Sequence, residues 1–268
     1  MMKQLTLEEI KDKEYDILVW FHNFCEKNDL KYSLAYGTLI GAVRHKNFIP
    51  WDDDIDVCMP RKDYERFLKL STNDFNINYI LLDFERNEKY IYHFAKIYDN
   101  RTIIKEETCM EIPLGVYIDI FPLDKIPNDP LKLKQYVFKM TILQKILFFS
   151  VNKRKSKSII KNIIKKILFI ICNLYGFKRA LKKIKKIRKV YDKYPNDCIS
   201  SITGNIRKEK MPKNSFDNLI KIKFRNDYFY CYKDYHNILK SLYGDYMVLP
   251  PKEKRVNHQM KAFYKERG

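Results

Sequence analysis

The 268-residue chain is poor in glycine and has no paired cysteines. Only seven glycines are present, so a glycine inside a motif is informative about local backbone geometry. The six cysteines form no CxxC pair and no Cys/His zinc spacing, which argues against a zinc module or a disulfide framework. Scattered cysteines of this kind are typical of reduced thiols in a cytosolic protein.

Long hydrophobic runs are also missing. The N-terminal stretch "MMKQLTLEEIKDKEYDILVW" has acidic residues where a signal peptide requires an apolar run. The longest purely apolar run in the most hydrophobic region is "ILFIIC", residues 167–172, far short of the roughly 20 residues that cross a bilayer. We therefore predict neither a secretion signal nor a transmembrane span. The 46% hydrophobic and 15% aromatic content is still ample for a packed core.

Acidic residues are absent from one long segment. Residues 131–190 contain 19 Lys or Arg and no Asp or Glu, although the whole chain has 52 basic and 33 acidic residues. The remaining 33 basic residues balance the 33 acidic ones, so the net charge of +19 belongs to this segment. The charge therefore marks a local region and not a generally basic surface.

The hydrophobic pattern predicts an α+β protein. "TLEE", starting at Thr6, is a capping box with Glu9 that opens a helix over residues 7–28. Further helices are predicted at 38–45, 61–70, 158–177, 179–191 and 235–244, and strands at 32–36, 54–59, 79–84, 90–99, 101–105 and 115–121. We divide the chain into a catalytic core (1–127), a basic amphipathic helical segment (128–195) and a C-terminal α+β region that packs back on the core (196–268).

The stretch "FIPWDDDIDVCMP" (48–60) concentrates four aspartates in a basic protein. Asp54 and Asp56 lie two residues apart on a predicted strand, so their side chains project from the same face. Two neighbouring carboxylates repel each other, and a divalent cation compensates that charge. Mg²⁺ favours a site with one or two carboxylates and substrate phosphate oxygens. An acidic turn on the surface is the alternative interpretation of such a run.

A third carboxylate occurs in "YIDIF", where Asp119 stands between two isoleucines. An unpaired carboxylate on a buried strand is costly, so Asp119 needs a partner. If its strand neighbours that of Asp54, the three carboxylates can hold two metals, which would clamp the attacking and leaving oxygens of a phosphoryl displacement. A core acid satisfied by the backbone or by an arginine is the alternative.

The residues upstream of the aspartates favour the metal interpretation. Gly37 and Thr38 follow a predicted strand and open a short helix. A glycine at this point allows close approach of a phosphate, the helix start offers N–H groups, and the threonine hydroxyl can donate to the same anion. Arg44 and His45 follow at the far end of the helix. A phosphate cradle followed by a metal-binding strand is typical of nucleotide-handling sites.

These residues resemble the three-part pattern of the nucleotidyltransferase superfamily. More closely, "YGTLIGAVRHKNFIPWDDDIDVCMPRKDY", "IDIFPLD" and "YGDYMVLPPKEKR" resemble the LicD family, which is related to the eukaryotic fukutin proteins. The resemblance covers about residues 5–125 and 235–260, and the middle helices are similar only in general character. It implies a nucleotidyltransferase-like core of a small mixed sheet with flanking helices, together with the basic helical subdomain.

By resemblance, Asp54 and Asp56 would bind Mg²⁺, with Mn²⁺ as the alternative ion. Asp119 would be the third metal carboxylate or the base for an acceptor hydroxyl. Gly37 and Thr38 would contact the phosphates of the donor. The spacing from Thr38 to Asp54 is long for the superfamily, and threonine replaces the commoner serine or glycine.

Three further positions take roles from the same resemblance. Arg44 and Lys96 would be charge partners for a diphosphate, and Asp52 would support the metal ligands. Asp53 occupies the variable position of the family's "PWDxDxD" block, so we expect it to point away and to be dispensable for the chemistry.

The activity implied is that of a bacterial Mg²⁺-dependent phosphotransferase. It would move phosphocholine, or a similar phospho-alcohol, from a CDP-activated donor to a sugar hydroxyl of a teichoic acid, lipopolysaccharide or capsule precursor, with CMP as leaving group. A nucleotidyltransferase acting on RNA or a small molecule with the same acidic triad is one alternative. A non-catalytic, membrane-associated scaffold is another.

The basic segment has two interpretations. Its apolar stripes, such as Ile160, Ile163, Ile164, Ile167, Ile171 and Leu174, either pack on the core or face a membrane. Sixty residues without an acid fit an anionic inner-leaflet surface, where a lipid-linked glycan acceptor would be found. We therefore expect a cytoplasmic protein that is peripheral to the inner membrane. Nucleic acid is not the expected partner, because the helices have continuous apolar stripes and no RNA-binding module.

Overall fold

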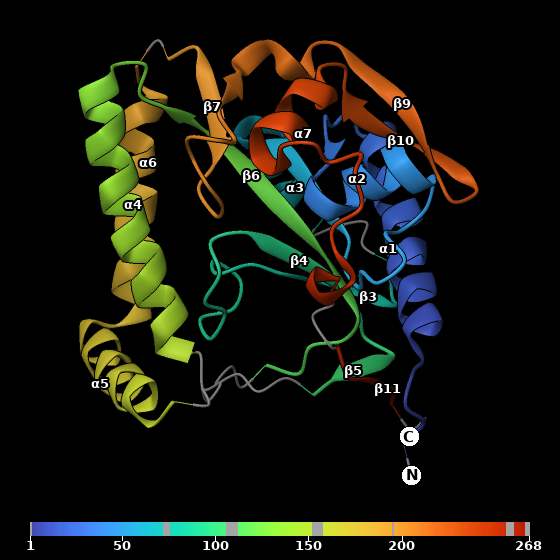
Figure 1. Ribbon diagram of the computed structural model, residues 1–268, viewed down its shortest axis with the longest axis horizontal. Coiled ribbons are helices and arrows are strands. Elements are labelled where there is room, and N and C mark those ends of the chain that lie inside the picture. The colour runs from blue at the N-terminus through green and yellow to red at the C-terminus, as the bar shows by residue number, and fades with distance from the viewer. Residues whose placement is uncertain are drawn as a thin grey trace.

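The computed structural model describes residues 2–71, 76–105, 112–151, 158–194, 196–255 and 260–265 (Figure 1). Its helices are α1 (Leu7–Lys27), α2 (Tyr36–His45), α3 (Arg61–Leu70), α4 (Pro130–Val151), α5 (Ile159–Tyr175), α6 (Phe177–Asp192) and α7 (Tyr235–Tyr243), with short 3-10 turns η1 (Lys213–Phe216) and η2 (Lys252–Lys254). Its strands are β1 (Ser33–Leu34), β2 (Asp56–Pro60), β3 (Tyr79–Leu82), β4 (Ala95–Asp99), β5 (Thr102–Ile104), β6 (Tyr117–Ile126), β7 (Cys198–Ser201), β8 (Met211–Pro212), β9 (Leu219–Phe224), β10 (Asp227–Tyr232) and β11 (Ala262–Tyr264).

A mixed sheet forms the centre of the protein. Its strands run in the order β1-β2-β6-β4-β3, and β7 and β8 extend it alongside the second half of β6. β2 and β6 are parallel, whereas the other neighbouring pairs are antiparallel. β6 is the long diagonal strand in Figure 1 and contacts three neighbours. The predicted combination of helices with a small mixed sheet is confirmed.

The first helix covers the sheet as its sequence pattern predicts. Thr6 caps α1, and the Thr6 and Glu9 side chains form both bonds of the predicted capping box. Ile17, Leu18 and Phe21 are fully buried on the inner face of the helix. They join a core cluster that contains Ile118 and Ile120 of β6, so α1 is fixed to the sheet by apolar packing.

Several boundaries differ from those predicted. α2 begins at Tyr36, two residues early, so Gly37 and Thr38 lie in its first turn. β2 begins at Asp56, so Asp54 precedes the ladder. The predicted strand 90–99 is a strand only from Ala95 onwards. Its first half is buried by side-chain packing, which produces the same apolar pattern without ladder hydrogen bonds.

The two ends of the chain meet beside the core. β5, predicted as a strand, pairs with β11 near the C-terminus and lies outside the central sheet. Gln4 forms an isolated bridge with Phe263 of β11. β9 and β10 form a separate hairpin near α1 and α2, and neither of the two was predicted as a strand. These pairings bring the C-terminal region back to the N-terminal part of the chain.

Helices α4, α5 and α6 stand together at one side of the sheet, with α5 at the far tip (Figure 1). α4 and α6 share a second apolar cluster, in which Leu181 and Ile184 are 3% exposed. α5 differs, because its apolar residues Ile160, Ile163, Ile164, Ile167, Ile170, Ile171 and Leu174 are each at least 50% exposed. The interpretation that the apolar stripe packs on the core is therefore correct for α6 and wrong for α5.

No helix in the described part of the chain has both the length and the hydropathy needed to cross a bilayer.

The cysteines of the described residues carry free thiols. Cys25, Cys58, Cys172 and Cys231 are buried, and Cys198 is partly exposed. The sixth, Cys109, lies outside the described residues.

Candidate functional site

The four aspartates of the acidic stretch separate into two faces. Asp52, Asp54 and Asp56 are partly exposed, whereas Asp53, Ile55 and Val57 between them are buried. This alternation begins before β2 and continues into it, because the backbone is extended on both sides of the strand boundary. The prediction that Asp54 and Asp56 share a face is therefore confirmed.

Three strands align the central residues of the site. Asp56 of β2 is the register partner of Asp119 on β6, and Asp119 is the register partner of Lys96 on β4. The Lys96 ammonium donates to Asp119 Oδ1 at 2.5 Å, and its side chain is only 5% exposed. Strand pairing thus brings residues from three distant parts of the sequence into one row.

The carboxylates crowd each other electrostatically. Burial raises the pKa of Asp56 well above its ordinary value, and the charges of Asp54, Asp119 and Asp52 raise it further. The Lys96 ammonium acts in the opposite direction. The site therefore carries negative charge that a divalent cation would compensate, and its all-oxygen donor set suits Mg²⁺.

The predicted metal ligands do not form a ready-made cluster. Within the described ranges, no three His, Cys, Asp or Glu side chains are arranged to hold a metal ion. Asp119 instead contacts Lys96, as expected for a carboxylate beside an ammonium group. Metal ligation by Asp54, Asp56 and Asp119 stays a prediction.

The start of α2 is tied to the acidic strand. The backbone N–H of Asp56 donates to Thr38 Oγ1 at 2.8 Å, and Thr38 is 2% exposed. A Cβ atom on Gly37 would lie 2.6 Å from Asp52 Oδ2, too close for any other residue without a shift. A side chain at position 37 would therefore have to displace the Asp52 carboxylate, and the predicted approach of a phosphate to Gly37 stays a prediction.

Arg44 lies away from the carboxylate row. It stands seven residues after Gly37, roughly 10 Å along the helix. Its guanidinium donates to the carbonyl of Tyr246 at 2.7 Å and to His45 Nε2 at 2.9 Å. Burial and the neighbouring Arg255 lower its pKa. In this structure Arg44 therefore binds the "YGDYM" segment, and its predicted contact with a diphosphate stays a prediction.

Arg255 of the C-terminal block lies beside the acidic stretch. Its guanidinium stacks over the Trp51 ring at 4.9 Å, and its Nε donates to the carbonyl of Pro250 at 2.9 Å. The sequence resemblance included this block without giving it a role. Trp51 directly precedes Asp52, so this contact holds the start of the acidic stretch in place.

Asp53 has a structural partner. It is 1% exposed, and its Oδ2 accepts the backbone N–H of Met260 at 3.1 Å. The prediction that it points away from Asp54 and Asp56 is correct. Its dispensability for the chemistry stays a prediction, but its carboxylate binds the C-terminal segment that leads to β11.

Two residues near the aspartates were missed from sequence. Glu14 of α1 is fully buried, and neither of its carboxylate oxygens has a hydrogen-bond partner among the residues that the structure describes. Burial, followed by the charge of Asp54, raises its pKa well above the ordinary value. Its position between Ile10 and Ile17 on the apolar face of α1 was a detectable signal. Tyr243 of α7 also has a raised pKa, from burial and then from Asp56.

A partly buried contact joins the start of α2 to the C-terminal region. The Tyr36 hydroxyl donates to Glu209 Oε2 at 2.7 Å, and Glu209 accepts the backbone N–H of Asn205 at 2.6 Å. Burial raises the pKa of Glu209. Tyr36 has a left-handed φ of 46°, a conformation that non-glycine residues rarely adopt. This contact holds the first residue of α2 against the loop that follows β7.

Comparison with known proteins assigns the chain to a family. The profile of the LicD/FKTN/FKRP nucleotidyltransferase domain matches residues 29–139. The chain is 35% identical over 267 residues to the lipopolysaccharide cholinephosphotransferase LicD of Haemophilus influenzae, covering 98% of this chain and 99% of that protein. This chain belongs to the LicD family. Uncharacterized proteins of Rickettsia prowazekii and Rickettsia typhi are each 29% identical over 46% of the chain, covering 46% and 38% of their own lengths.

The family assignment confirms the resemblance seen in the sequence. The profile match spans Gly37, Thr38, Asp56, Lys96 and Asp119, the residues that the fold brings together around the start of α2 and the row of three strands. The full-length match also includes helices α4 to α6 and the C-terminal region.

Proposed function

We propose that the chain is a phosphotransferase that moves phosphocholine from a CDP-activated donor to a sugar hydroxyl of a lipopolysaccharide-type glycan. The observation that carries the proposal is the row of Asp56, Asp119 and Lys96 on adjacent strands, next to the N-terminus of α2. Such a site has groups for cation binding, proton transfer and phosphate neutralisation. The relative from Haemophilus influenzae is a lipopolysaccharide cholinephosphotransferase, which supports the choice of choline and of the acceptor.

Asp54 and Asp56 would hold Mg²⁺, with Mn²⁺ as the alternative ion, and Asp119 would be either the third metal carboxylate or the base for the acceptor hydroxyl. The crowding of carboxylates around Asp56 supports this assignment, because each added negative charge raises the pKa of that group. When bound, the ion would neutralise charge on the donor diphosphate.

The side chains of the protein would bind the donor and move the proton. The first turn of α2 offers backbone N–H groups to a donor phosphate, and the Thr38 hydroxyl, which accepts from Asp56, can donate its own hydrogen to that anion. The acceptor oxygen forms a bond with the phosphorus that carries choline, and the bond from this phosphorus to CMP breaks. With Asp119 as the base, the acceptor proton passes to its carboxylate, while Lys96 neutralises charge on the departing phosphate.

Aromatic rings beside the carboxylates suit a quaternary ammonium. The rings of Tyr92, Phe94 and Tyr117 surround the Lys96 ammonium, at 5.5, 5.4 and 3.5 Å from its Nζ to the ring centroids. A cation held between aromatic faces is the arrangement used to recognise choline. Tyr92 and Tyr117 are partly exposed.

The reaction can be tested with a panel of CDP-alcohols, Mg²⁺ and a lipopolysaccharide-derived acceptor. We expect CMP release with transfer of phosphocholine to the glycan, and loss of both with Asp54→Asn and with Asp119→Asn. Mass spectrometry of the acceptor separates this reaction from the alternative. Addition of a cytidine monophosphate group to the acceptor would contradict the proposal and favour a nucleotidyltransferase.

We also propose that α5 binds an anionic inner-leaflet membrane surface. Its exposed isoleucines stand together with Lys161, Lys165 and Lys166 and with no acidic residue. A helix with apolar and basic faces inserts shallowly at an anionic interface, where each basic residue contributes up to about 1 kcal/mol. A location at this surface would bring the site to a lipid-linked acceptor.

Flotation with vesicles of phosphatidylglycerol and phosphatidylcholine tests this surface. We expect the wild type to float and the double variant Ile163→Gln/Ile167→Gln to stay in solution. The matched variant Lys183→Gln on α6 should float as the wild type does. Tight binding to RNA at physiological salt without vesicle binding would contradict the proposal.

A further inference from the structure

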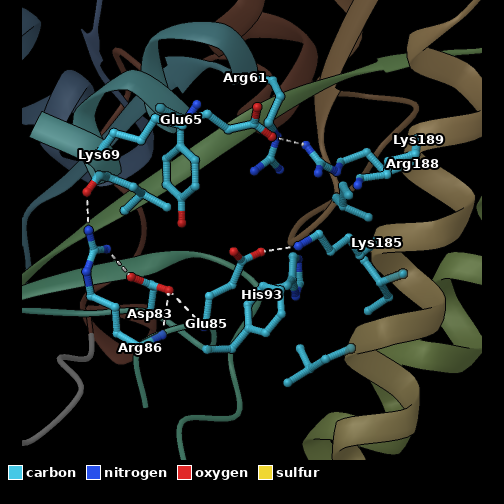
Figure 2. A pocket seen from close by; sticks show the side chains of 16 residues that line it. Arg61, Glu65, Lys69, Asp83, Glu85, Arg86, His93, Lys185, Arg188 and Lys189 are labelled. Atoms are coloured by element: carbon cyan, nitrogen blue, oxygen red, sulfur yellow. Dashed lines mark hydrogen bonds and ion pairs between the residues drawn. The ribbon is translucent and has the colours of Figure 1, made fainter. Parts of the chain in front are cut away.

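A cavity of about 620 Å³ lies between the core and the helical segment (Figure 2). Its walls come from α3, from the residues between β3 and β4, and from α6. The volume is within the range of sites that hold small molecules. None of Asp54, Asp56, Asp119 and Lys96 lines it.

The cavity lies on the other face of the sheet from the carboxylate row. Asp124 of β6, which is paired with Arg61 of the cavity wall, follows Asp119 by five residues. Successive side chains of a strand alternate between faces, so an odd separation directs these two carboxylates to opposite faces. They are also roughly 16 Å apart along the strand. A ligand in the cavity would therefore be distinct from the donor in the carboxylate site.

The wall of the cavity carries more positive than negative charge. Three acidic side chains line it, and each contacts a cation: Glu65 accepts from Arg188 at 2.9 Å, Asp83 contacts Arg86, and Glu85 contacts Lys185. The cationic lining residues are Arg61, Lys69, Arg86, Lys185, Arg188 and Lys189. Asp124, behind the wall, accepts two hydrogen bonds from Arg61 and lies 3.7 Å from Arg188. Six cations therefore stand against four carboxylates, and the remaining positive charge attracts an anion.

The same wall presents a neutral polar group. His93 is 8% exposed, its Nε2 lies 3.2 Å from Thr203 Oγ1, and its buried Nδ1 has no hydrogen-bond partner among the described residues. Burial lowers the pKa of His93 to about 4, so the imidazole is neutral at physiological pH. A neutral imidazole nitrogen without a partner is suited to a ligand hydroxyl.

Aromatic faces complete the lining. Tyr64 and Phe84 contribute rings next to the charged groups. A saccharide presents an apolar C–H face to such rings and hydroxyls to the carboxylates and the imidazole. A bare phosphate would use the cations alone. The combination of rings, paired carboxylates, a neutral histidine and surplus cations matches a polyhydroxylated anion.

We propose that this cavity is a second binding site, specific for a phosphorylated saccharide. The phosphate contacts Lys185 and Lys189 of α6, and the sugar ring lies against the partly exposed Phe84 with a hydroxyl on His93 Nδ1. A second hollow on α6 shares Lys185 and Lys189 and adds Lys182, Lys186 and Lys193, so further phosphates of a longer ligand would meet cations there. The site does not depend on the transfer reaction.

Isothermal titration calorimetry of the full chain with glucose 6-phosphate, glucose and inorganic phosphate tests the proposal at physiological salt. We expect glucose 6-phosphate to bind more tightly than either of the other two. Lys185→Gln/Lys189→Gln should weaken it at least about tenfold, because a lost charge-assisted contact costs about 1.5–3 kcal/mol. His93→Asn should weaken binding of glucose 6-phosphate and leave that of inorganic phosphate unchanged.

Two controls separate this site from other effects. Lys183→Gln removes a charge from the same helix at a position outside both hollows, and should leave the affinity within about twofold. Asp56→Asn should bind glucose 6-phosphate as the wild type does, so failure of the transferase proposal does not affect this result. Three results would each overturn the proposal. Lys183→Gln could weaken the binding of glucose 6-phosphate as much as Lys185→Gln/Lys189→Gln does, the protein could bind phosphate and glucose 6-phosphate with equal affinity, or it could bind no glucose 6-phosphate at all.

Discussion

Asp56 and Asp119 occupy directly opposed positions on the parallel strands β2 and β6. Neighbouring strands are about 4.8 Å apart, so the two carboxylates are held close together by backbone pairing. Lys96 contacts Asp119 from the other side, and the pKa of Asp56 is still raised. The fold therefore maintains an unfavourable concentration of negative charge at this point, which is typical of a functional site.

Asp56→Asn should abolish transfer and stabilise the protein. The variant removes a predicted metal ligand, so we expect kcat to fall at least about 100-fold. It also removes a carboxylate that its neighbours repel. The melting temperature in the absence of divalent ions should rise by about 2–4 °C, which corresponds to about 1 kcal/mol in a chain of this size. Calorimetry and a CMP-release assay measure the two effects.

Asp53→Ala is the matched control for that variant. It should lower the melting temperature, because the N–H of Met260 loses a buried acceptor worth about 1 kcal/mol, and it should retain kcat. Loss of activity with unchanged stability in Asp53→Ala would contradict the division of the aspartates into two faces.

Mg²⁺ should raise the melting temperature of the wild type. An ion that binds only the folded state stabilises it by about 1.4 kcal/mol when its free concentration is ten times its Kd. This corresponds to a rise of about 3–6 °C in the melting temperature. Asp54→Asn and Asp56→Asn should each reduce the shift, because fewer carboxylates attract the ion. K⁺ at equal ionic strength is the control, and an equal shift in all three proteins would exclude these aspartates as ligands.

Thr38→Val should lower both stability and activity. Valine has nearly the same shape but provides no acceptor for the N–H of Asp56, at a cost of about 1–3 kcal/mol. Thr38→Ser keeps the hydroxyl and should behave almost as the wild type. Denaturant unfolding and KM for the CDP-choline donor are the measurements. If Thr38→Ser is as impaired as Thr38→Val, the methyl group and not the hydroxyl is the important feature.

Glu14→Gln should stabilise the protein in a pH-dependent manner. The pKa of Glu14 is raised in the folded state above its ordinary value of 4.5, so the folded protein retains a proton that the unfolded chain loses. Wild-type stability therefore falls as the pH rises above 4.5 towards the folded pKa. The glutamine variant does not lose stability in this way. Its melting temperature should exceed that of the wild type by about 2–4 °C at pH 8, and the two melting temperatures should be equal at pH 4.

The exposed Glu8 on the same helix provides the control. Its carboxylate is 72% exposed, so Glu8→Gln should not change the pH profile of stability. A pH-independent effect of Glu14→Gln would show that packing, and not ionisation, determines the behaviour of this residue.

Helices with strong local signals were predictable from sequence. The capping box at Thr6 and the apolar face that follows it specify α1 without reference to the rest of the chain. The alternation at Asp54 and Asp56 likewise follows from the period of an extended backbone. The strand predicted at 90–99 was too long, because side chains before Ala95 are buried by packing without ladder bonds, and the apolar pattern is the same in both cases.

Long-range relationships in the site were not predictable. No local pattern relates Lys96 to Asp119, because their contact depends on the register of β4 against β6. The bond from Asp53 to the N–H of Met260 joins residues that are 207 positions apart. The hydrogen bond from Arg44 to the carbonyl of Tyr246 likewise depends on the return of the C-terminal segment.

The sequence by itself determined the elements with local causes: the helix caps, the amphipathic periods, the shared face of Asp54 and Asp56, and the concentration of charge in residues 131–190. The tertiary structure alone decided which charges meet and which apolar stripes are covered. Leu181 of α6 is buried and Ile167 of α5 is exposed, although both belong to similar basic amphipathic patterns. Periodicity specifies that a helix has an apolar face, but the surface that this face contacts depends on where the rest of the chain folds.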